Sequence, residues 1–235
     1  MKIAFLLTQG LKDPSGLGRY WPLAKELTKL GHKVAIIALH PNFKSLERRC
    51  FNEQGVTVYY VSQMHIHKAG SYKRYFNPFQ LIGISILAAL RLAVAALRVR
   101  ADVYHICKPH PMNGIAAWLT GFIKGKPLYL DCDDFETASN RFSGRWQKTI
   151  VAFFEQNLPG IVKGVTTNTR FMERLLQRWG VPRNRIIYVP NGVDRERFQP
   201  LNGERIKEIR RQLKLEGRPV VLYIGSLSLV NHAVD

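Results

Sequence analysis

The sequence predicts an α/β protein built on a doubly wound parallel sheet, and three observations lead to this prediction. Short apolar runs alternate along the chain with segments whose apolar residues recur at helical spacing. The runs lack polar alternation, as expected for strands that are buried on both faces. A glycine-rich stretch follows the first run and opens the first helix. Together these features are typical of parallel strands joined by helical crossovers.

The elements follow in order from this pattern. Residues 2–8 form the first predicted strand, and residues 18–30 form a helix in which Trp21, Ala24 and Leu27 share one face. Gly31 ends that helix. The further predicted strands are 33–39, 56–61, 103–107, 128–132, 165–168 and 186–189, and the further predicted helices are 82–99, 112–123, 145–157 and 171–179.

The helix over residues 82–99 has two interpretations, because residues 79–97 are nearly all apolar. A membrane span needs about 20 apolar residues. Arg91 interrupts the run, and an arginine at mid-membrane is costly. Arg91 and Arg98 share one side of the helix, so the sequence favours a helix with one polar stripe that packs against the sheet.

The charge balance indicates an anionic partner. The chain has 35 Lys and Arg against 17 Asp and Glu, a formal net charge of +18. Nucleic acid, an acidic membrane surface and a phosphorylated substrate each fit such a balance, but no nucleic-acid-binding motif is present, so we expect no nucleic acid partner. Residues 65–76 mix basic and aromatic side chains without a period; they fit either an exposed loop or a contact with a membrane surface or acceptor.

Cysteine usage indicates a reducing compartment. Cys50, Cys107 and Cys132 are scattered singly, which argues against a disulfide framework and a structural zinc site. The N-terminal apolar run has five residues and no small-residue cleavage site, so it is interpreted as a buried strand. We expect a cytoplasmic protein and leave peripheral attachment to the inner face of the membrane open.

Three polar or glycine-rich segments follow predicted strands. Gly16 and Gly18 precede the first helix, where glycines permit close backbone approach and helix N–H groups can bind phosphate. His105 is predicted at a strand end, where it could orient a substrate hydroxyl or phosphate, or be a buried histidine bonded to backbone. Asp131, Asp133 and Asp134 could bind a metal or act as acid and base, and Asp133 or Asp134 could instead cap a helix.

The segment 181–200, VPRNRIIYVPNGVDRERFQP, is the most specific in the chain. Pro190 stops the strand over 186–189, and Asn191 with Gly192 supplies a turn that tolerates a positive φ. Asp194 can cap a following helical turn, which Pro200 closes. This segment resembles the end of the N-terminal domain in the GT-B fold glycosyltransferases of group 1, or family 4, which are retaining and use nucleotide sugars.

The resemblance covers essentially the whole chain and implies roles for individual residues. Gly16 and Gly18 match the loop that lies against the donor diphosphate, and Asn191 and Gly225 match further donor-side positions. His105 matches the first histidine of the family's P-D-V-V-H-x-H-x-P pattern, with Cys107 in place of the second. Asp134 matches the aspartate of the family's His-Asp pair, so His105 and Asp134 are the catalytic candidates.

The resemblance also implies the organisation and the reaction. Residues 1–200 would form the N-terminal, acceptor-side domain, 201–219 a linker, and 220–235 the first strand of a donor-binding domain that is truncated here. The complete enzyme would transfer a sugar from a nucleotide-diphosphate sugar to a glycan, lipid-linked or small-molecule acceptor. The resemblance implies no metal or other cofactor, and this chain alone is predicted inactive.

Two alternatives from other classes remain at this point. A regulatory or redox module could bind a dinucleotide, but His40 stands where an acidic ribose-binding residue would follow the second strand. A basic module without catalysis could bind nucleotide or an anionic membrane surface.

Overall fold

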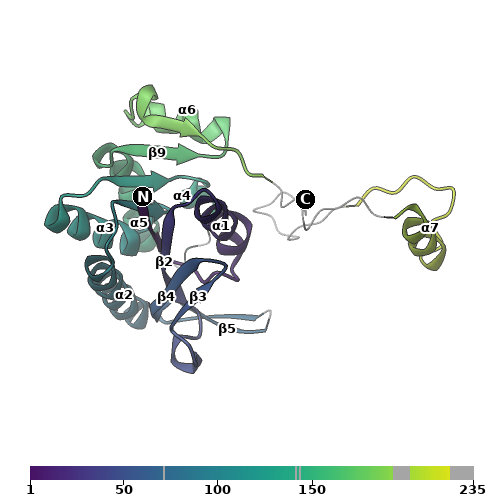
Figure 1. Ribbon diagram of the computed structural model, residues 1–235, viewed down its shortest axis with the longest axis horizontal. Coiled ribbons are helices and arrows are strands. Elements are labelled where there is room, and N and C mark those ends of the chain that lie inside the picture. Colours follow the sequence, from purple (N-terminus) through teal and green to yellow (C-terminus); the bar gives the residue numbers. More distant parts are fainter. Residues whose placement is uncertain (71, 141, 143, 193–201, 223–235) are drawn as a thin grey trace. The chain divides into compact units, whose positions relative to one another are not determined.

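The computed structural model describes residues 1–70, 72–140, 142, 144–192 and 202–222. Contacts within the chain divide it into two units, residues 1–191 and 192–235. The first unit contains a sheet of eight strands in the order β10-β9-β8-β7-β1-β2-β4-β3, shown in Figure 1. All neighbouring strands are parallel except β3 and β4. The predicted fold class is therefore confirmed.

The strands of the described residues are β1 Lys2–Leu7, β2 Lys33–His40, β3 Cys50–Glu53, β4 Val56–Gln63, β5 Ile66–Ala69, β6 Tyr72–Tyr75, β7 Val103–Cys107, β8 Leu128–Asp131, β9 Gly164–Thr167 and β10 Ile186–Tyr188. The helices are η1 Gly16–Tyr20, α1 Trp21–Lys29, η2 Phe43–Ser45, α2 Pro78–Arg98, α3 Pro111–Lys124, α4 Glu136–Ser139, α5 Arg145–Ile161, α6 Arg170–Arg178, η3 Arg183–Arg185 and α7 Gly203–Gln212.

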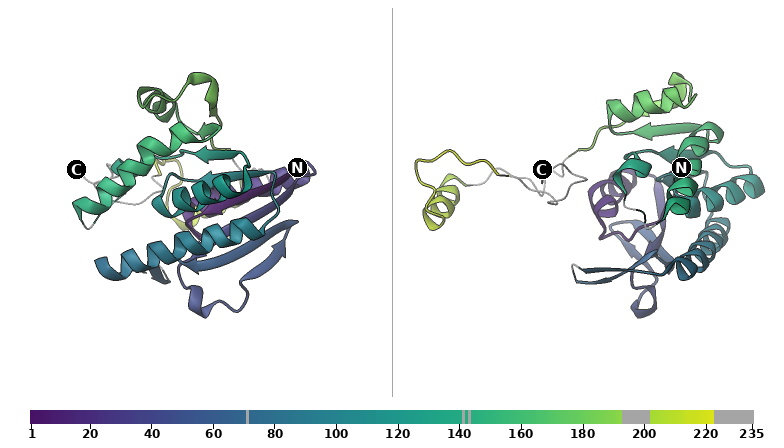
Figure 2. Two further views of the ribbon diagram at one scale, coloured as in Figure 1. Left: turned by 90° about the vertical axis from the view of Figure 1, so that its left-hand side faces the viewer. Right: turned by 180° about the vertical axis from the view of Figure 1, so that it is seen from behind.

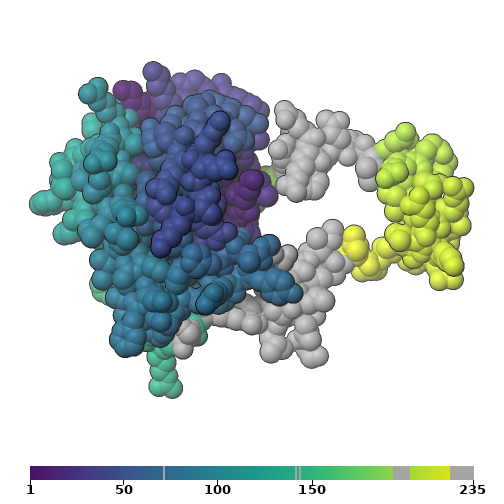
Figure 3. Space-filling model, turned by 90° about the horizontal axis from the view of Figure 1, so that it is seen from below, coloured from purple at the N-terminus to yellow at the C-terminus, as the bar shows by residue number. Residues whose placement is uncertain are grey.

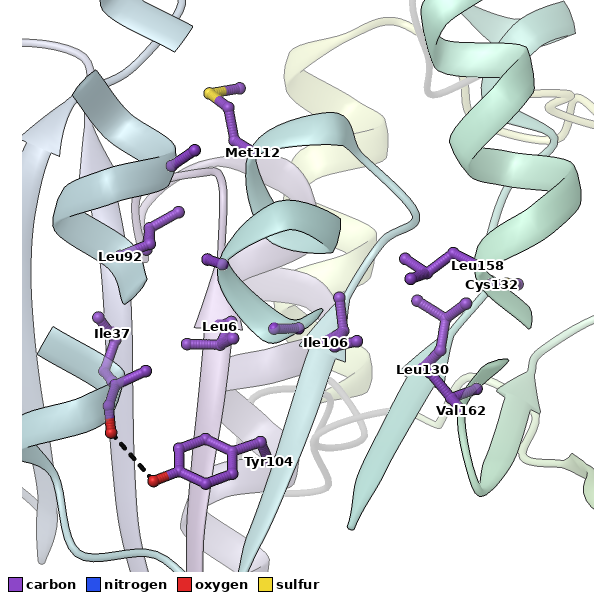
Figure 4. Packing of buried hydrophobic residues seen from close by; sticks show 14 of the residues in the cluster. Leu6, Ile37, Leu92, Tyr104, Ile106, Met112, Leu130, Cys132, Leu158 and Val162 are labelled. Carbon is purple, nitrogen blue, oxygen red and sulfur yellow. Dashed lines mark hydrogen bonds between the residues drawn. The ribbon is translucent and has the colours of Figure 1, made fainter. Parts of the chain in front are cut away.

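Two cores lie on opposite faces of the sheet. The larger is formed between the sheet and helices α2, α3, α5 and α6, and Figure 4 shows Leu6, Ile106 and Leu130 in it. The Tyr104 hydroxyl donates to the Ala96 carbonyl at 3.0 Å, which satisfies the one polar group of this buried ring. The smaller core packs α1 against the other face through Ala24 and its neighbours.

The sequence patterns did not predict strand β3 or the pair formed by β5 and β6. Strand β3 pairs antiparallel with β4 at the sheet edge, which appears in dark blue in Figure 3 with the teal helices on one side. Residues 65–76, interpreted above as a segment without a period, contain the antiparallel pair β5 and β6. The pattern failed because most side chains of this pair are exposed or half-buried, so no apolar alternation marks it.

The second unit is described at Gly192 and over residues 202–222. The predicted linker contains α7, a helix without buried residues whose ion pairs, such as Glu204 with Lys207, span one turn. Val220–Leu222 form no strand. The rest of the strand predicted over 220–224 lies outside the described residues, as do Gly225, Asp194 and the domain boundary predicted at residue 200.

Candidate functional site

The candidate site lies where the strand order of the sheet reverses, between β1 and β7. Strands on either side of such a point send their connections to opposite faces, which opens a crevice outside their carboxyl ends. The segments that follow β1, β7, β8 and β10 meet at this edge. The sequence predicted site residues on the segments that follow β1, β8 and β10, and one, His105, within β7.

The loop after β1 is held by Asp13, which is buried. Its Oδ2 accepts a hydrogen bond from the Gly10 backbone N–H at 2.7 Å, and its other oxygen is paired with the ammonium of Lys68 in β5. The Leu11 N–H donates to the hydroxyl of Tyr60 in β4 at 3.3 Å. The loop is therefore fixed to both the sheet and the β5–β6 pair.

The two glycines of this loop have different surroundings. Gly16 is buried, and a Cβ built on it would lie 2.3 Å from the Gly10 carbonyl oxygen. Gly18 is exposed, and a Cβ there would meet nothing within 4 Å. Neither has a positive φ. Gly16 is therefore required for the loop to pack on itself, while Gly18 is exposed and has free space where a side chain would lie.

Arg19, which the sequence patterns did not single out, joins this loop to the ends of other strands. Its Nε and Nη2 donate to the two oxygens of Asp131 at 2.7 Å each. The side chains of Arg19 and Asp131 are 10% and 2% exposed. The Tyr20 hydroxyl and the Thr166 hydroxyl donate to the same carboxylate at 3.0 and 2.5 Å.

This pairing keeps both groups ionised in a buried place. Burial opposes ionisation of Asp131, but the hydrogen bonds and charge of Arg19 outweigh it and lower the pKa of the carboxyl. Burial likewise opposes the charge of Arg19, and Asp131 raises its pKa in return. A bidentate pair of this kind fixes geometry as well as charge.

Asn191 is brought to the same arginine. Nη1 of Arg19 donates to the Asn191 side-chain oxygen at 2.6 Å and contacts the Val189 carbonyl at 3.4 Å. Neither Asn191 nor Gly192 has a positive φ, so the turn expected there is not left-handed. The hydrogen bond from Arg19 to the amide oxygen of Asn191 instead links the segment after β10 to η1.

A second charged cluster follows β7 and β8. The Lys108 ammonium lies 2.6 Å from Glu136 Oε1, 2.8 Å from Asp134 Oδ2 and 3.2 Å from Asp133 Oδ1. Lys108 is 3% exposed and has a φ of +82°, a conformation that side chains other than glycine rarely adopt. His110 lies at 3.2 Å from the second oxygen of Glu136. Strain at such a position is typical of functional sites.

The pKa values of the two buried carboxyls in this cluster, Asp133 and Glu136, are shifted in opposite directions. Burial raises the pKa of Asp133 to about 6, against the attraction of Lys108 and with the repulsion of Asp134, Asp131 and Glu136. Glu136 is also penalised by burial, but His110 and Lys108 outweigh it and hold its pKa well below the ordinary value. Burial of Lys108 is similarly overcome by the surrounding carboxylates, which raise its pKa.

Asp133, Asp134 and Glu136 lie close enough to offer oxygens to one cation, since their ligand atoms are all within 4.8 Å of one another. The Lys108 ammonium already contacts all three carboxylates. A metal ion bound by this set would therefore require the Lys108 side chain to leave. No other cluster of this kind occurs in the described residues.

The opposite pKa shifts give a pH prediction for stability. The pKa of Asp133 is higher in the folded protein, so its contribution to stability is present below about pH 4 and lost as the pH rises through about 6. Asp133→Asn should remove this loss of stability, which amounts to up to about 3 kcal/mol. The free energy of unfolding of the variant, relative to that of the wild type, should therefore rise between pH 4 and pH 7. Urea unfolding at both pH values measures the difference.

Glu136→Gln is the matched control, because the pKa of Glu136 is shifted downward. Its stabilisation is present above its ordinary pKa and lost as the pH falls, so this variant should be weaker than the wild type at pH 7 and closer to it at low pH. Parallel pH profiles for both variants and the wild type would contradict the assignment of the two shifts.

His105 does not lie where the sequence placed it. It is the third residue of β7, opposite Phe5 of β1 and Tyr129 of β8, and not at the strand end. Its ring packs 5.0 Å from that of Phe5, its buried Nδ1 has no partner among the described residues, and burial lowers its pKa. The strand continues to Cys107 because the apolar Ile106 and Cys107 are both buried.

The structure thus brings the loop of Gly16 and Gly18 together with Asn191 through Arg19. It places Asp134, half exposed, beside Lys108. The residues that the sequence patterns missed are Arg19, Lys108, His110 and Glu136. Sequence patterns do not show which charged side chains will be buried. The position of Lys108 directly after a predicted strand was nevertheless a signal that could have been used.

Residues 15–197 match the sequence profile described as Glycosyltransferase Family 4. The chain belongs to this family. The match includes Arg19, Lys108 and Asn191, and so contains most of the edge described above. No curated protein matches the chain by sequence.

Solved structures of GT-B glycosyltransferases share the fold at low identity. Sucrose-phosphate synthase from Thermosynechococcus elongatus matches 97% of this chain and 56% of its own at 13% identity, with a TM-score of 0.68. Starch synthase IV from Arabidopsis thaliana, bound to ADP and acarbose, matches 94% of this chain and 60% of its own at 15% identity and a TM-score of 0.61. Anabaena HepE in complex with UDP-glucose matches 92% and 50% at 17% identity and a TM-score of 0.59.

The chain therefore spans about half the length of these structures. The matched region is one half of a GT-B glycosyltransferase, as the sequence predicted.

Proposed function

We propose that this chain supplies the acceptor-side half of a retaining glycosyltransferase that moves a sugar from a nucleotide-diphosphate donor to an acceptor. The observation that carries the proposal is the match of residues 15–197 to glycosyltransferase family 4. The complexes of Anabaena HepE with UDP and with UDP-glucose support a nucleotide sugar as the donor. The acceptor would be a glycan, a lipid-linked sugar or a small molecule.

The carboxyl edge of the sheet would form one wall of the site. Gly18 is exposed in the first helical turn, next to Arg19, and a diphosphate would approach the backbone there. Catalysis would rest on electrostatic support of the departing diphosphate, without a metal ion, so activity is expected to survive a chelator. Gly16 and Asn191 would hold the loop in place for this contact, and Gly225 would belong to the donor side.

Asp134 and His105 take different parts in this proposal. Asp134 is half exposed at the edge and would contact the acceptor. His105 lies inside β7 near Asp131 and Arg19, whose charges act on its ring. We assign it a positioning role beneath the Arg19–Asp131 pair, in place of the direct catalytic role that the resemblance implied.

The dinucleotide alternative has less support. His40 ends β2, where a ribose-binding carboxylate would stand, and its Nδ1 accepts a hydrogen bond from the Asn42 backbone at 3.1 Å. The nitrogen is thus already engaged in the local turn. A titration with dinucleotides is expected to give no binding.

Residues 1–235 on their own are expected not to transfer sugar. A site between two domains requires donor and acceptor to be enclosed together with water excluded, and this chain matches about half of each relative. The measurement is nucleotide release from a panel of nucleotide sugars, with and without candidate acceptors. A longer in-frame product of the same gene, where the coding sequence continues, should turn over at least one donor.

Two results would count against different parts of the proposal. Turnover by residues 1–235 would show that one half suffices and would overturn the division of labour. A longer product that binds no nucleotide sugar would overturn the donor class itself. As part of this proposal we place the protein in the cytoplasm, where it would meet its nucleotide-sugar donor.

A further inference from the structure

Helices α2, α3 and α5 lie side by side on one face of the sheet, as Figure 2 shows in its left view. Their outward surface is apolar. The large apolar side chains that are at least 40% exposed are Phe79, Ile82, Ile86, Leu87, Leu90 and Val94 of α2, Ile115, Trp118, Phe122 and Ile123 of α3, and Trp146, Ile150, Phe153 and Ile161 of α5. Soluble monomers rarely expose so many large apolar groups together. We call these residues the apolar face.

Helical spacing places these side chains away from the sheet. In α2 the exposed Ile82, Ile86 and Leu90 recur every four residues, while Ala88, Leu92 and Ala96 are buried against the sheet. Helix α2 has 21 residues and contains an 18-residue window with a mean hydropathy of 2.0, so it is long and apolar enough to cross a membrane. Because one side of it packs on the sheet, we infer that it lies along a surface and does not span one.

The charges around the apolar face are mostly positive. The three helices contain a single acidic residue, Glu155, which is fully buried and accepts hydrogen bonds from the backbone N–H groups of Glu136 and Thr137. Each helix leads into a parallel strand, so the carboxyl ends of the helices meet at one edge of the sheet. Exposed basic residues gather there: Arg98 at the end of α2, Arg100 after it, Lys126 after α3 and Lys163 after α5. The exposed Asp102 lies among them, and its carboxylate accepts a hydrogen bond from the Lys2 backbone N–H at 2.8 Å.

Two hollows lie among these basic residues. A groove of about 840 Å³ between α2 and strands β1, β2 and β4 is lined by Lys2, Lys33, Arg91, Arg98 and Arg100 together with apolar side chains. A pocket of about 400 Å³ is lined by Lys126, Lys163 and Arg185. Neither lining contains an acidic residue. The positive charge of both linings favours a phosphate group.

We propose that the apolar face docks on the surface of an anionic phospholipid bilayer. The apolar side chains would enter the boundary between headgroups and acyl chains, and the basic helix ends would contact lipid phosphates. A second copy of this chain is a poorer occupant, because it carries the same basic ends and the same net charge of +18. The proposal does not depend on the sugar-transfer reaction.

Vesicle co-sedimentation of the whole chain tests the apolar part. The wild type should bind vesicles of phosphatidylcholine with phosphatidylglycerol. The double variant Phe79→Ser/Phe122→Ser changes side chains that are 86% and 81% exposed, so the fold should survive. It should bind at least about tenfold more weakly. The matched control Leu30→Ser/Phe171→Ser changes exposed side chains on α6 and at the end of α1 and should bind as the wild type does.

A second set of variants tests the charges. Arg98→Gln/Arg100→Gln/Lys126→Gln should weaken binding about hundredfold, since each basic residue near an anionic surface contributes about fivefold. The control Lys44→Gln/Arg48→Gln/Arg178→Gln removes the same charge from other exposed positions and should have a much smaller effect. The tryptophan emission should shift to the blue with vesicles, and Trp118→Phe/Trp146→Phe should remove that shift, because both side chains belong to the apolar face.

Four results would overturn the proposal. These are equal binding to phosphatidylcholine alone, equal losses in variants and controls, or a dimer in light scattering that Phe79→Ser/Phe122→Ser abolishes. The fourth is a loss confined to Lys73→Gln/Arg74→Gln, which would move the lipid contact to the β5–β6 pair.

Discussion

Lys108→Met is expected to destabilise the first unit by about 3–5 kcal/mol, because it leaves buried carboxylates without their cation. The ammonium of Lys108 contacts Asp133, Asp134 and Glu136 at 3.2 Å or less, and both Asp133 and Glu136 are buried. Methionine keeps much of the volume of the side chain and removes its charge. Urea unfolding followed by near-ultraviolet circular dichroism measures the loss.

Two controls separate charge from backbone strain. Lys29→Met removes an exposed partner of Glu26 and should change stability by less than about 1 kcal/mol. Lys108→Gly also removes the ammonium but relieves the positive φ of this position, so it should be destabilised less than Lys108→Met. If Lys108→Met unfolds like the wild type, the cluster does not depend on its cation.

The sequence predicted the fold well because apolar runs report burial. Strands such as β2 and β7 are buried on both faces and read as continuous apolar segments, and their ranges were predicted to within one residue. Strand β3 and the β5–β6 pair were missed because their side chains are largely exposed. Exposed strands do not need the apolar residues by which the buried strands were recognised. Helix α7 was missed for the same reason, since its stabilising pairs are between charges.

The site was less predictable, because its chemistry depends on which strand ends become neighbours. Nothing in the sequence relates Arg19 to Asp131 or Asn191, which lie more than 100 residues away; the sheet order alone brings them together. His105 was expected at a strand end, but it is the third of the five residues of β7 and lies within the sheet. The sequence singled out Gly16 and Gly18 together, and only the structure separates the packed Gly16 from the exposed Gly18.

Gly16→Val is expected to destabilise the first unit by about 4 kcal/mol or more, because the clash it creates is with backbone. A Cβ at this position would lie 2.3 Å from the Gly10 carbonyl oxygen and 3.0 Å from Leu11. The loop cannot retreat freely, since Asp13 and Tyr60 hold it by hydrogen bonds to Gly10 and Leu11. Thermal and urea unfolding measure the loss.

Gly18→Ala is the matched control, two residues along the same helical turn. A Cβ there meets nothing within 4 Å, and the φ is not positive, so the variant should be as stable as the wild type or slightly more stable. In a catalytically competent longer product, Gly18→Ala should affect function and leave stability unchanged. Gly18→Ala should weaken donor binding while the fold is kept, because its open backbone is proposed to face the diphosphate. Loss of stability in Gly18→Ala, or an unaffected Gly16→Val, would show that the loop packs differently from the arrangement described.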